Sequence, residues 1–393
     1  MKRVLIVFVL TAILIAPFSV TVRSADSNWF TDKEPVTDYA FSFALVGDTQ
    51  YITLQAPEKL PMIYDFIIDH REEKKIAFVF GLGDITHTST PAEWATAKES
   101  IERLNGIVPY SVIRGNHDKP QPFNQAFATE FYLSEQDGFY KEGEIDNVYR
   151  TFSVCGNDFL QLTLDYGPTN RILNWAEEII EAHPNHRVII STHGYLNKDG
   201  TTLDASDPYA PSGGDTSGII NNGDQIWEKL ISKHENIFLV LSGHISSKNV
   251  IVTQTKGLHG NTVTQMLVDT QFLDQEEPAG NIVMLYFSND GETVSIEQYS
   301  TIRKQYYMRE SQREITVPRF SVNPPFFEAT SEAESTTEDC SASSAELTEA
   351  LPSKTGCHAV LTARGFGFVA VLPLLAAAPL VIVKRRRTSA GAD

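Results

Sequence analysis

Five short apolar segments of this chain each end in a tight turn that contains glycine and carries Asp, Asn or His. The turns are Gly47-Asp48-Thr-Gln50, Gly83-Asp84, Gly115-Asn116-His117-Asp118, Thr192-His193-Gly194 and Gly243-His244. In open α/β sheets, sites form where the carboxyl ends of neighbouring strands meet, so these turns are expected to lie together. Asp, Asn and His together make a mixed oxygen and nitrogen ligand set that suits Mn, Fe or Zn. The pattern therefore predicts a metal centre at one edge of an α/β sheet.

Strand-like and helix-like segments alternate through the first part of the chain. Strand patterns cover 41–46, 76–80, 108–113, 148–154, 159–164, 187–191 and 237–241, and helical patterns cover 58–74, 91–104, 169–182 and 224–234. Thr90 stands directly before Pro91, which is typical of a helix start. From about 248 to 300 the chain has four strand-like runs and no helical one. This order predicts a sandwich of sheets covered by helices.

The five turns resemble the five ordered motifs of calcineurin-like metallophosphoesterases. Gly115-Asn116-His117-Asp118 is the most diagnostic of them, and the resemblance runs from Phe41 to Ser300. It implies an α/β fold, a four-layer αββα sandwich of two mixed β-sheets flanked by helices. We expect this phosphoesterase domain to occupy residues 40–303.

The resemblance also implies a role for each motif residue. Two metal ions, of Mn, Fe or Zn, would be bound by Asp48, Gln50, Asp84, Asn116, His193 and His244. Asp84 would bridge them, with Asp48 on the first ion and Asn116, His193 and His244 on the second. His117, held by Asp118, would stabilise charge on the phosphoryl group or protonate the leaving alkoxide. The implied activity is hydrolysis of phosphate mono- or diesters by a metal-activated hydroxide.

Two positions depart from the family's motifs, and both belong to the first metal site. The first motif normally reads Asp-x-His and the fifth Gly-His-x-His, whereas this chain has Gln50 and Ser246. Gln50 still offers an amide oxygen, but Ser246 is a poor ligand. We therefore expect an intact second site and a first site that is weak, prefers a harder ion, or fills only with substrate. The substitutions leave open a degenerate metal- or ligand-binding surface protein without turnover, while a plain adhesin would leave the motifs unexplained.

Residues close to the motifs are further candidates. His87 follows Asp84 by three residues and either faces the cleft or lies in a plain loop. Tyr195 and Asn197 follow the fourth motif and are candidate substrate contacts. The segment 197–222 is long for a connection, and such loops are usually functional or disordered. We expect it to rim the pocket and to set specificity.

Charge and cysteine content restrict the partners. The net charge of −18 argues against nucleic acid as a primary partner, because binding a polyanion needs a basic face. No basic cluster near the motifs indicates a polyphosphorylated ligand, so a small phosphorylated substrate is expected. The three cysteines, Cys155, Cys340 and Cys357, are too few and too scattered for a disulfide framework. Cys155 is expected to be a small core residue, and the sequence gives no indication of oligomeric state.

The first residues of the chain are typical of a secretory signal. Lys2 and Arg3 precede an apolar run, and small residues suitable for cleavage follow it, so residues 1–24 are expected to be a signal peptide. An uncleaved anchor helix is the alternative. In both cases the bulk of the chain crosses a membrane.

The last part of the chain predicts an anchor to the outer face of the cell membrane. Residues 326–351, rich in Ser, Thr and Glu, are expected to form a disordered acidic stalk. Residues 365–383 are uncharged and long enough to cross a bilayer core of about 30 Å as a single-pass C-terminal helix. The basic tail 384–393 would then be cytoplasmic. The segment 351–356 resembles a sortase sorting signal with one extra residue, so simple membrane anchoring rather than cell-wall attachment is expected.

Overall fold

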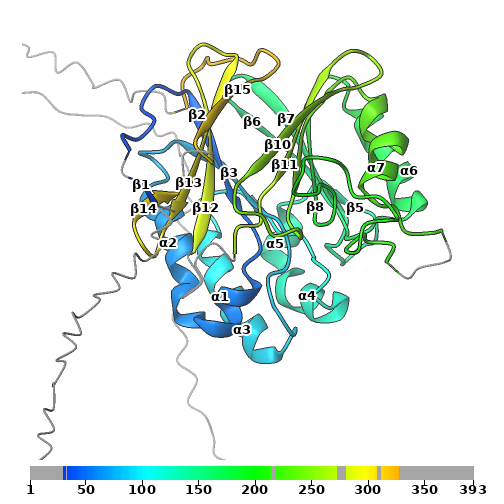
Figure 1. The fold of residues 1–393 in the computed structure, drawn as a ribbon, viewed down its shortest axis with the longest axis horizontal. Coiled ribbons are helices and arrows are strands. Elements are labelled where there is room, and N and C mark those ends of the chain that lie inside the picture. Colours follow the sequence, from blue (N-terminus) through cyan, green and yellow to red (C-terminus); the bar gives the residue numbers. More distant parts are fainter. Residues whose placement is uncertain (1–29, 32, 214–217, 272–279, 308–310, 327–393) are drawn as a thin grey trace, which may run out of the picture. The chain divides into compact units, whose positions relative to one another are not determined.

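The computed structural model describes residues 30–326, except 32, 214–217, 272–279 and 308–310 (Figure 1). Several predicted features lie outside the described residues: the signal peptide (1–24), the stalk 326–351 beyond its first residue, the anchor 365–383, the tail 384–393 and two of the cysteines. No helix within the described residues has the length and apolar content needed to cross a membrane. The described residues all belong to one compact unit, which ends at Thr330.

Two mixed β-sheets form the centre of this unit. The first has the order β1 (Phe30–Thr31), β14 (Gln305–Tyr307), β13 (Thr293–Ser300), β12 (Asn281–Phe287), β2 (Phe41–Val46), β3 (Ile76–Gly81), β4 (Tyr110–Ser111), and β15 (Arg313–Thr316) pairs with β13. The second has the order β10 (Ile251–Lys256), β11 (Thr262–Leu267), β9 (Ile237–Ser242), β8 (Arg187–Thr192), β7 (Asn157–Leu164), β6 (Val148–Val154), β5 (Gly138–Phe139). Strands β2, β3 and β4 run parallel, as do β7, β8, β9 and β11, and the remaining pairs are antiparallel.

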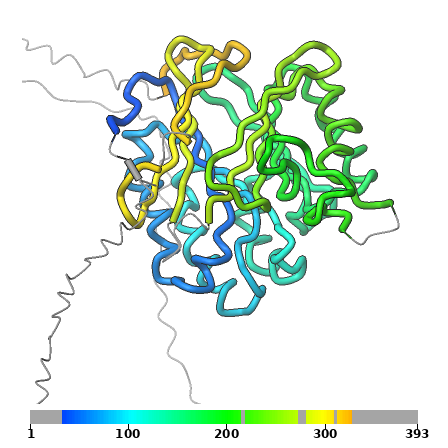
Figure 2. The backbone as a smooth tube through the Cα atoms, viewed as in Figure 1, coloured from blue at the N-terminus to red at the C-terminus, as the bar shows by residue number. Residues whose placement is uncertain are grey.

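Helices cover the outer face of each sheet, as the path of the chain shows (Figures 1 and 2). The helices of the first sheet are α1 (Gln50–Gln55), α2 (Pro61–Asp69), α3 (Pro91–Ile101), α4 (Pro120–Phe127) and α5 (Glu130–Ser134), with short 3₁₀ turns at Pro57–Lys59 and Glu102–Leu104. The second sheet carries α6 (Asn170–Ala182), α7 (Gly223–Lys229) and the 3₁₀ turn Ile231–Lys233. Three separate groups of buried apolar side chains fill the spaces between these layers. The expected four-layer αββα sandwich is confirmed.

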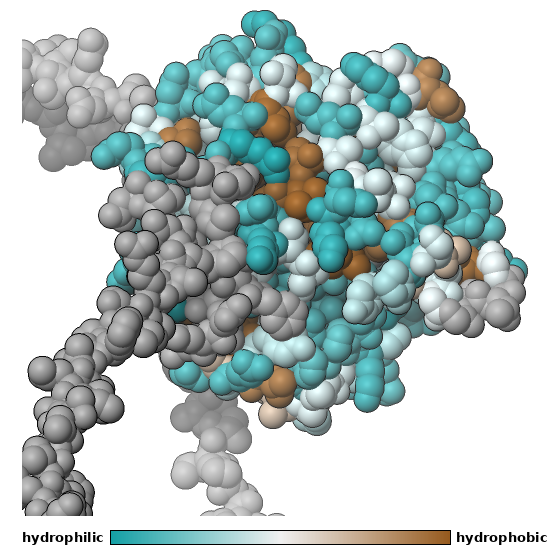
Figure 3. Space-filling model, in the orientation of Figure 1, coloured by the Kyte–Doolittle hydropathy of each residue, from teal (hydrophilic) through white to brown (hydrophobic). Residues whose placement is uncertain are grey.

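The strand β2 shows how the sequence builds the layers. Successive side chains of a strand point to opposite faces. Phe41, Phe43 and Leu45 enter the core between the two sheets, while Ala44 and Val46 face the helices of the first sheet. Both faces are buried, so the strand is apolar except for Ser42, whose buried hydroxyl donates to the Lys74 carbonyl. On the face drawn in Figure 3 the surface is mostly hydrophilic, with apolar side chains in small patches.

Several element boundaries differ from the sequence prediction. The predicted helix 58–74 is helical only at α2, because the polar residues after Asp69 have no apolar surface to bury and form turns. The predicted strand 108–113 pairs only at Tyr110–Ser111. Strands β14 and β15 extend the first sheet past 303, where the domain was expected to end. Thr90 caps α3 in a capping box, and Cys155 is a buried core residue, as expected.

Candidate active site

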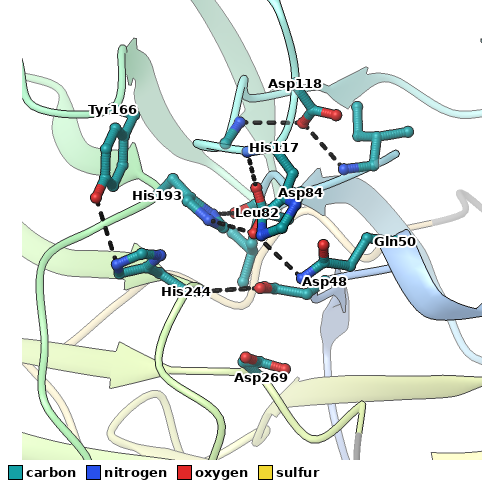
Figure 4. Close-up of polar contacts among 12 residues, drawn as sticks. Asp48, Gln50, Leu82, Asp84, His117, Asp118, Tyr166, His193, His244 and Asp269 are labelled. Carbon is teal, nitrogen blue, oxygen red and sulfur yellow. Dashed lines mark hydrogen bonds and ion pairs between the residues drawn. The ribbon is translucent and has the colours of Figure 1, made fainter. Parts of the chain in front are cut away.

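The five turns meet at one edge of the sandwich, where parallel strands of both sheets end (Figure 4). β2 leads to Asp48 and β3 leads to Asp84, while β8 and β9 lead to His193 and His244. One ligand atom from each of Asp84, His193 and His244 lies within 4.8 Å of the others. The strand ends therefore bring these three predicted ligands together, and their binding of a metal stays a prediction.

Glycine is required in two of the turns because side chains of the site lie against the backbone. A Cβ on Gly115 would lie 2.1 Å from Asp84 Oδ1, and a Cβ on Gly243 would lie 2.2 Å from Asp48 Oδ1. Non-bonded heavy atoms do not approach this closely, so any larger residue would displace the carboxylates. The glycines of the motifs therefore set the spacing of the acidic ligands.

Asp84 lies at the centre of the group. Its backbone has φ of 45°, a strained conformation for a residue with a side chain. Oδ1 accepts a hydrogen bond from the His117 amide at 2.9 Å, and Oδ2 lies 3.2 Å from His193 Nε2. Burial by itself would raise the pKa of Asp84, but the nearby His193 and the hydrogen bonds outweigh burial and lower it. Asp84 is therefore held ionised, as a bridging ligand must be.

The two histidines are oriented by backbone carbonyls. His193 is fully buried, and its Nδ1 donates to the Leu82 carbonyl at 2.7 Å. Its Nε2 lies 3.2 Å from Asp84 Oδ2 and has no other polar partner among the described residues. His244 Nε2 donates to the Tyr209 carbonyl at 2.7 Å, which leaves Nδ1 unprotonated. Metal-binding histidines usually donate their second ring nitrogen in this way, so both side chains fit a metal ion.

The protonation of His244 also suits metal binding. Burial, followed by repulsion from His193, lowers the pKa of His244 to about 4. The ring is therefore neutral near pH 7, and a neutral imidazole is the form that binds metals. The orphaned nitrogen of His193 and the neutral His244 together show that the residues present fit the metal ions that this donor set implies.

Asn116 and His117 face the cavity from the turn after β4. Asn116 is exposed and makes no hydrogen bond with any of the described residues, so its amide is available to a ligand. His117 Nδ1 donates to the carbonyl of His87 at 2.8 Å, and the two rings stack with centroids 4.9 Å apart. The free nitrogen of His117 is thus Nε2. His87 lies at the edge of the site and orients His117.

The expected catalytic role of Asp118 is not what the geometry shows. Its carboxylate accepts hydrogen bonds from the backbone amides of Ile85 and Thr86, both at 2.9 Å, and from the Gly115 amide at 3.1 Å. No hydrogen bond joins it to the His117 ring, which His87 holds instead. Asp118 is fully buried and ties the turn after β3 to the turn after β4. It is a positioning residue, and neighbours in sequence were wrongly expected to be partners in space.

Asp48 and Gln50, the predicted ligands of the first metal site, both contact residues of this group. Both Asp48 oxygens accept from the His244 amide at 3.2 Å. Burial, followed by repulsion from Asp269 and Asp84, raises the pKa of Asp48. Gln50 Nε2 donates to Asp84 Oδ2 at 3.4 Å, and Gln50 Oε1 accepts from His87 Nδ1 at 2.9 Å. The side chains needed for a first site are thus present around Asp84.

Asp269 belongs to the site but was not predicted. It lies two residues after the end of β11, is fully buried, and its carboxylate is a neighbour of Asp48 (Figure 4). The signal in the sequence was weak, because only the short apolar run 266–268 precedes Asp269 and no glycine marks the turn as in the other motifs. In contrast, Tyr195 is buried and donates its hydroxyl to Gln265, so the expectation that it contacts substrate is wrong.

A cavity of about 640 Å³ opens over the ligand group. Its floor carries Gln50, Asp84, Asn116, His117 and His244. Its rim is formed by Tyr51 and by Asn197, Lys198, Pro208 and Tyr209, which belong to the long segment 197–222. The prediction that this segment borders the pocket is confirmed, and Asn197 takes part as expected.

Comparison with known proteins agrees with the site. The calcineurin-like phosphoesterase family matches residues 41–248. The chain is 26% identical to the uncharacterized protein YvnB of Bacillus subtilis over 303 residues, which are 73% of this chain and 22% of YvnB. It is 25% identical to the probable glycerophosphodiester phosphodiesterase GpdQ of Arcobacter nitrofigilis, over 42% of this chain and 54% of that protein. The chain thus spans about a fifth and about half of the lengths of these curated relatives.

Two solved structures are similar at low identity. A dimetal phosphatase from Danio rerio aligns with a TM-score of 0.47 and 14% identity, over 72% of this chain and all of its own. A purple acid phosphatase from yellow lupin seeds aligns with a TM-score of 0.44 and 14% identity, over 70% of this chain and 53% of its own. The matched segment 41–248 is 208 of the 393 residues, more than half of the chain. This protein belongs to the calcineurin-like phosphoesterase family.

Proposed function

We propose that this enzyme hydrolyses a small phosphate diester in preference to a monoester, and that it does so outside the cell. The observation that supports the ester class is the charge of the cavity. Lys198 is the single Lys or Arg among the described residues that line it. A diester carries one negative charge where a monoester near neutral pH carries almost two. The single ammonium group of Lys198 and the wide cavity therefore suit a phosphate diester, which carries one negative charge and two alcohol groups.

Two metal ions, when bound, would lower the pKa of a water molecule and neutralise charge on the phosphoryl oxygens. In the reaction, a water oxygen forms a new bond to phosphorus and the bond to the leaving alcohol oxygen breaks. His117 Nε2 is the group placed to deliver a proton to that oxygen, because Nδ1 is engaged by the His87 carbonyl. The side chain of Asn116 lines the same cavity and is free to bind the second metal ion.

The rim supplies contacts for the two alcohols. Tyr51 and Tyr209 offer aromatic rings, and Lys198 offers a cation that attracts the anionic phosphate. Tyr209 is two-thirds exposed, so its ring is available to a ligand. The name of one relative, a probable glycerophosphodiester phosphodiesterase, is consistent with a small diester.

Paired chromogenic substrates test the proposal. The protein is stripped of metal, reloaded separately with Mn, Fe, Zn and Mg, and assayed with bis(p-nitrophenyl) phosphate and p-nitrophenyl phosphate. We expect metal-dependent turnover with a higher kcat/KM for the diester, and loss of turnover in Asp84→Asn. A higher kcat/KM for the monoester would contradict the proposed ester class.

A metal-binding protein without turnover is the second candidate, and Gln50 and Ser246 are the observations that favour it. Bound metal without hydrolysis of either ester, under every metal tested, would support this candidate. The proposed location rests on the apolar segments at 1–24 and 365–383. Protease added to intact cells should remove the domain if it lies outside, and protection of the domain would contradict that location.

A further inference from the structure

We propose that Asp269 binds the first metal ion in place of the imidazoles that Gln50 and Ser246 replace, so that this site is built from oxygen ligands alone. The inference rests on the proposed function in that both require metal ions at this edge of the sandwich. It concerns a residue that lies outside the five motifs and was not predicted from the sequence.

The position of Asp269 follows from sheet pairing. β11 runs parallel to β9, with Leu267 opposite Ser242, and the Val268 amide donates to the Ser242 carbonyl at 2.8 Å. The next residue, Asp269, therefore lies beside the turn that carries His244. On its other side the Val268 carbonyl lies against Gly47, where a Cβ would come within 2.3 Å of it. The end of β11 thus lies between the first turn, which carries Asp48, and the fifth turn, which carries His244.

The carboxylate of Asp269 is held in a fixed orientation. It is fully buried, and Oδ2 accepts from Ser246 Oγ at 2.9 Å. Gln271 donates its amide to Oδ1 and its Nε2 to Oδ2, both at 3.3 Å. A carboxylate has about four lone-pair positions, so Asp269 retains capacity for a cation. Ser246 is a poor metal ligand itself, but its hydroxyl orients the carboxylate of Asp269, which is a good metal ligand.

Three buried carboxylates, Asp48, Asp84 and Asp269, lie on this side of the site. Asp48 and Asp269 are neighbours, and Asp84 is the next acidic group (Figure 4). Removing several like charges from water costs free energy unless a cation compensates them. A second observation at this edge is the buried Nε2 of His193, which lies 3.2 Å from Asp84 Oδ2 and has no other polar partner among the described residues. The carboxylates and this ring nitrogen are donors that a metal ion can use.

The ligand sets of the two sites then differ in chemistry. Asp48, Asp84 and Asp269 supply oxygens to the first site, and a half-turn of the Gln50 amide would add Oε1. His87 Nδ1 would then accept from the Gln50 amide nitrogen instead of donating to Oε1, a change of tautomer only. Oxygen-only sites select Mg²⁺ or Mn²⁺, whereas the imidazoles of the second site suit Zn²⁺ or Fe. We therefore expect the two sites to take unlike ions.

Metal titration of variants tests this assignment. The metal-free full chain is titrated calorimetrically with Mn²⁺ and with Zn²⁺, and Mn²⁺ is also followed by electron paramagnetic resonance. We compare Asp269→Asn with Ser246→Ala, which removes the orienting hydroxyl but keeps the carboxylate. Loss of an outer-shell partner weakens metal binding by about 10- to 100-fold, so Ser246→Ala should fall in that range and Asp269→Asn should exceed it for Mn²⁺. Zn²⁺ binding through His193 and His244 should change little.

Thermal unfolding without metal separates a ligand from a structural residue. Asp269→Asn removes one of two neighbouring buried carboxylates, so the metal-free variant should unfold at the same or a higher temperature than the parent. A lower unfolding temperature together with unchanged Mn²⁺ affinity would assign Asp269 a structural role and overturn the inference. If the parent binds neither ion, the proposed function fails as well. If the parent binds metal and hydrolyses the substrates, but Asp269→Asn binds Mn²⁺ with unchanged affinity, this inference alone is overturned.

Discussion

Replacing Glu93 by Gln should destabilise the protein in a way that depends on pH. Glu93 opens α3, and its carboxylate accepts hydrogen bonds from the amides of His87, Thr88 and Thr90 at 2.8, 3.0 and 2.9 Å. The hydroxyls of both threonines donate to it as well. The loop it organises carries His87, whose carbonyl orients His117. One buried carboxylate thus links the start of a helix to the loop that orients His117.

The size of the effect follows from the pKa of Glu93. Burial alone would raise this pKa, but hydrogen bonds from Thr88 and Thr90 outweigh burial and lower it from 4.5 to about 2. At about 1.36 kcal/mol per pKa unit this gives roughly 3 kcal/mol, and screening by solvent at the loop reduces it to about 2 kcal/mol. Because the folded pKa lies below the unfolded one, the stabilisation is complete above about pH 4.5 and is lost as pH falls toward about 2.

Urea unfolding of the parent and Glu93→Gln at a series of pH values measures this difference. We expect the parent to be about 2 kcal/mol more stable near pH 7, with the gap narrowing steadily below about pH 4.5. Glu99→Gln, an exposed position on the same helix, is the matched control and should change little. A gap that stays constant down to about pH 3 would refute the reasoning, because it would not come from ionisation of Glu93.

Three further substitutions test other parts of the structure. His117→Ala should lower kcat by about 10²- to 10⁴-fold with metal content unchanged. The loss should be smaller for esters of nitrophenol, because this leaving group needs no proton. An equal loss of kcat for all leaving groups would contradict proton donation by His117. Arg114→Met should cost about 3–5 kcal/mol in urea unfolding, because it leaves buried Asp146 and Asp165 without their cation; a cost under about 1 kcal/mol would contradict a buried ion pair. Phe43→Ala, in the fully buried aromatic core between the sheets, should cost about 3–5 kcal/mol, and a smaller loss would mean that the cavity collapses.

Most of the fold was predictable because the strands are buried on both faces. Segment 237–241 is an unbroken apolar run and segment 41–46 is apolar except for Ser42, and their observed strands differ from them by no more than one residue. Sheet order was not predictable from these runs, since β2 pairs with β12, more than two hundred residues later in the chain. Short-range patterns carry no information about such partners. Periodicity indicated a sandwich of sheets covered by helices, and the resemblance to known phosphoesterases supplied the four layers.

The site residues were predictable where a glycine-containing turn follows a strand. The prediction failed where the role of a residue depends on the direction in which its side chain points. Asp118 is adjacent to His117 in sequence, yet it points into the protein to accept amides while His117 points to the cavity. Tyr195 follows His193 by two residues and enters the core of the second sheet. Asp269 was overlooked because no glycine marks its turn. These three cases depend on how each turn is packed, which the sequence pattern does not encode.

Anomalous diffraction from crystals grown with Mn²⁺ and Zn²⁺ tests most directly whether this edge of the sandwich is a two-metal hydrolytic site. We predict one peak within bonding distance of Asp84, Asn116, His193 and His244, and a second on the other side of Asp84, beside Asp48. Absence of any peak at His193 and His244, in crystals where the fold is intact, would contradict the assignment of this site as the metal centre.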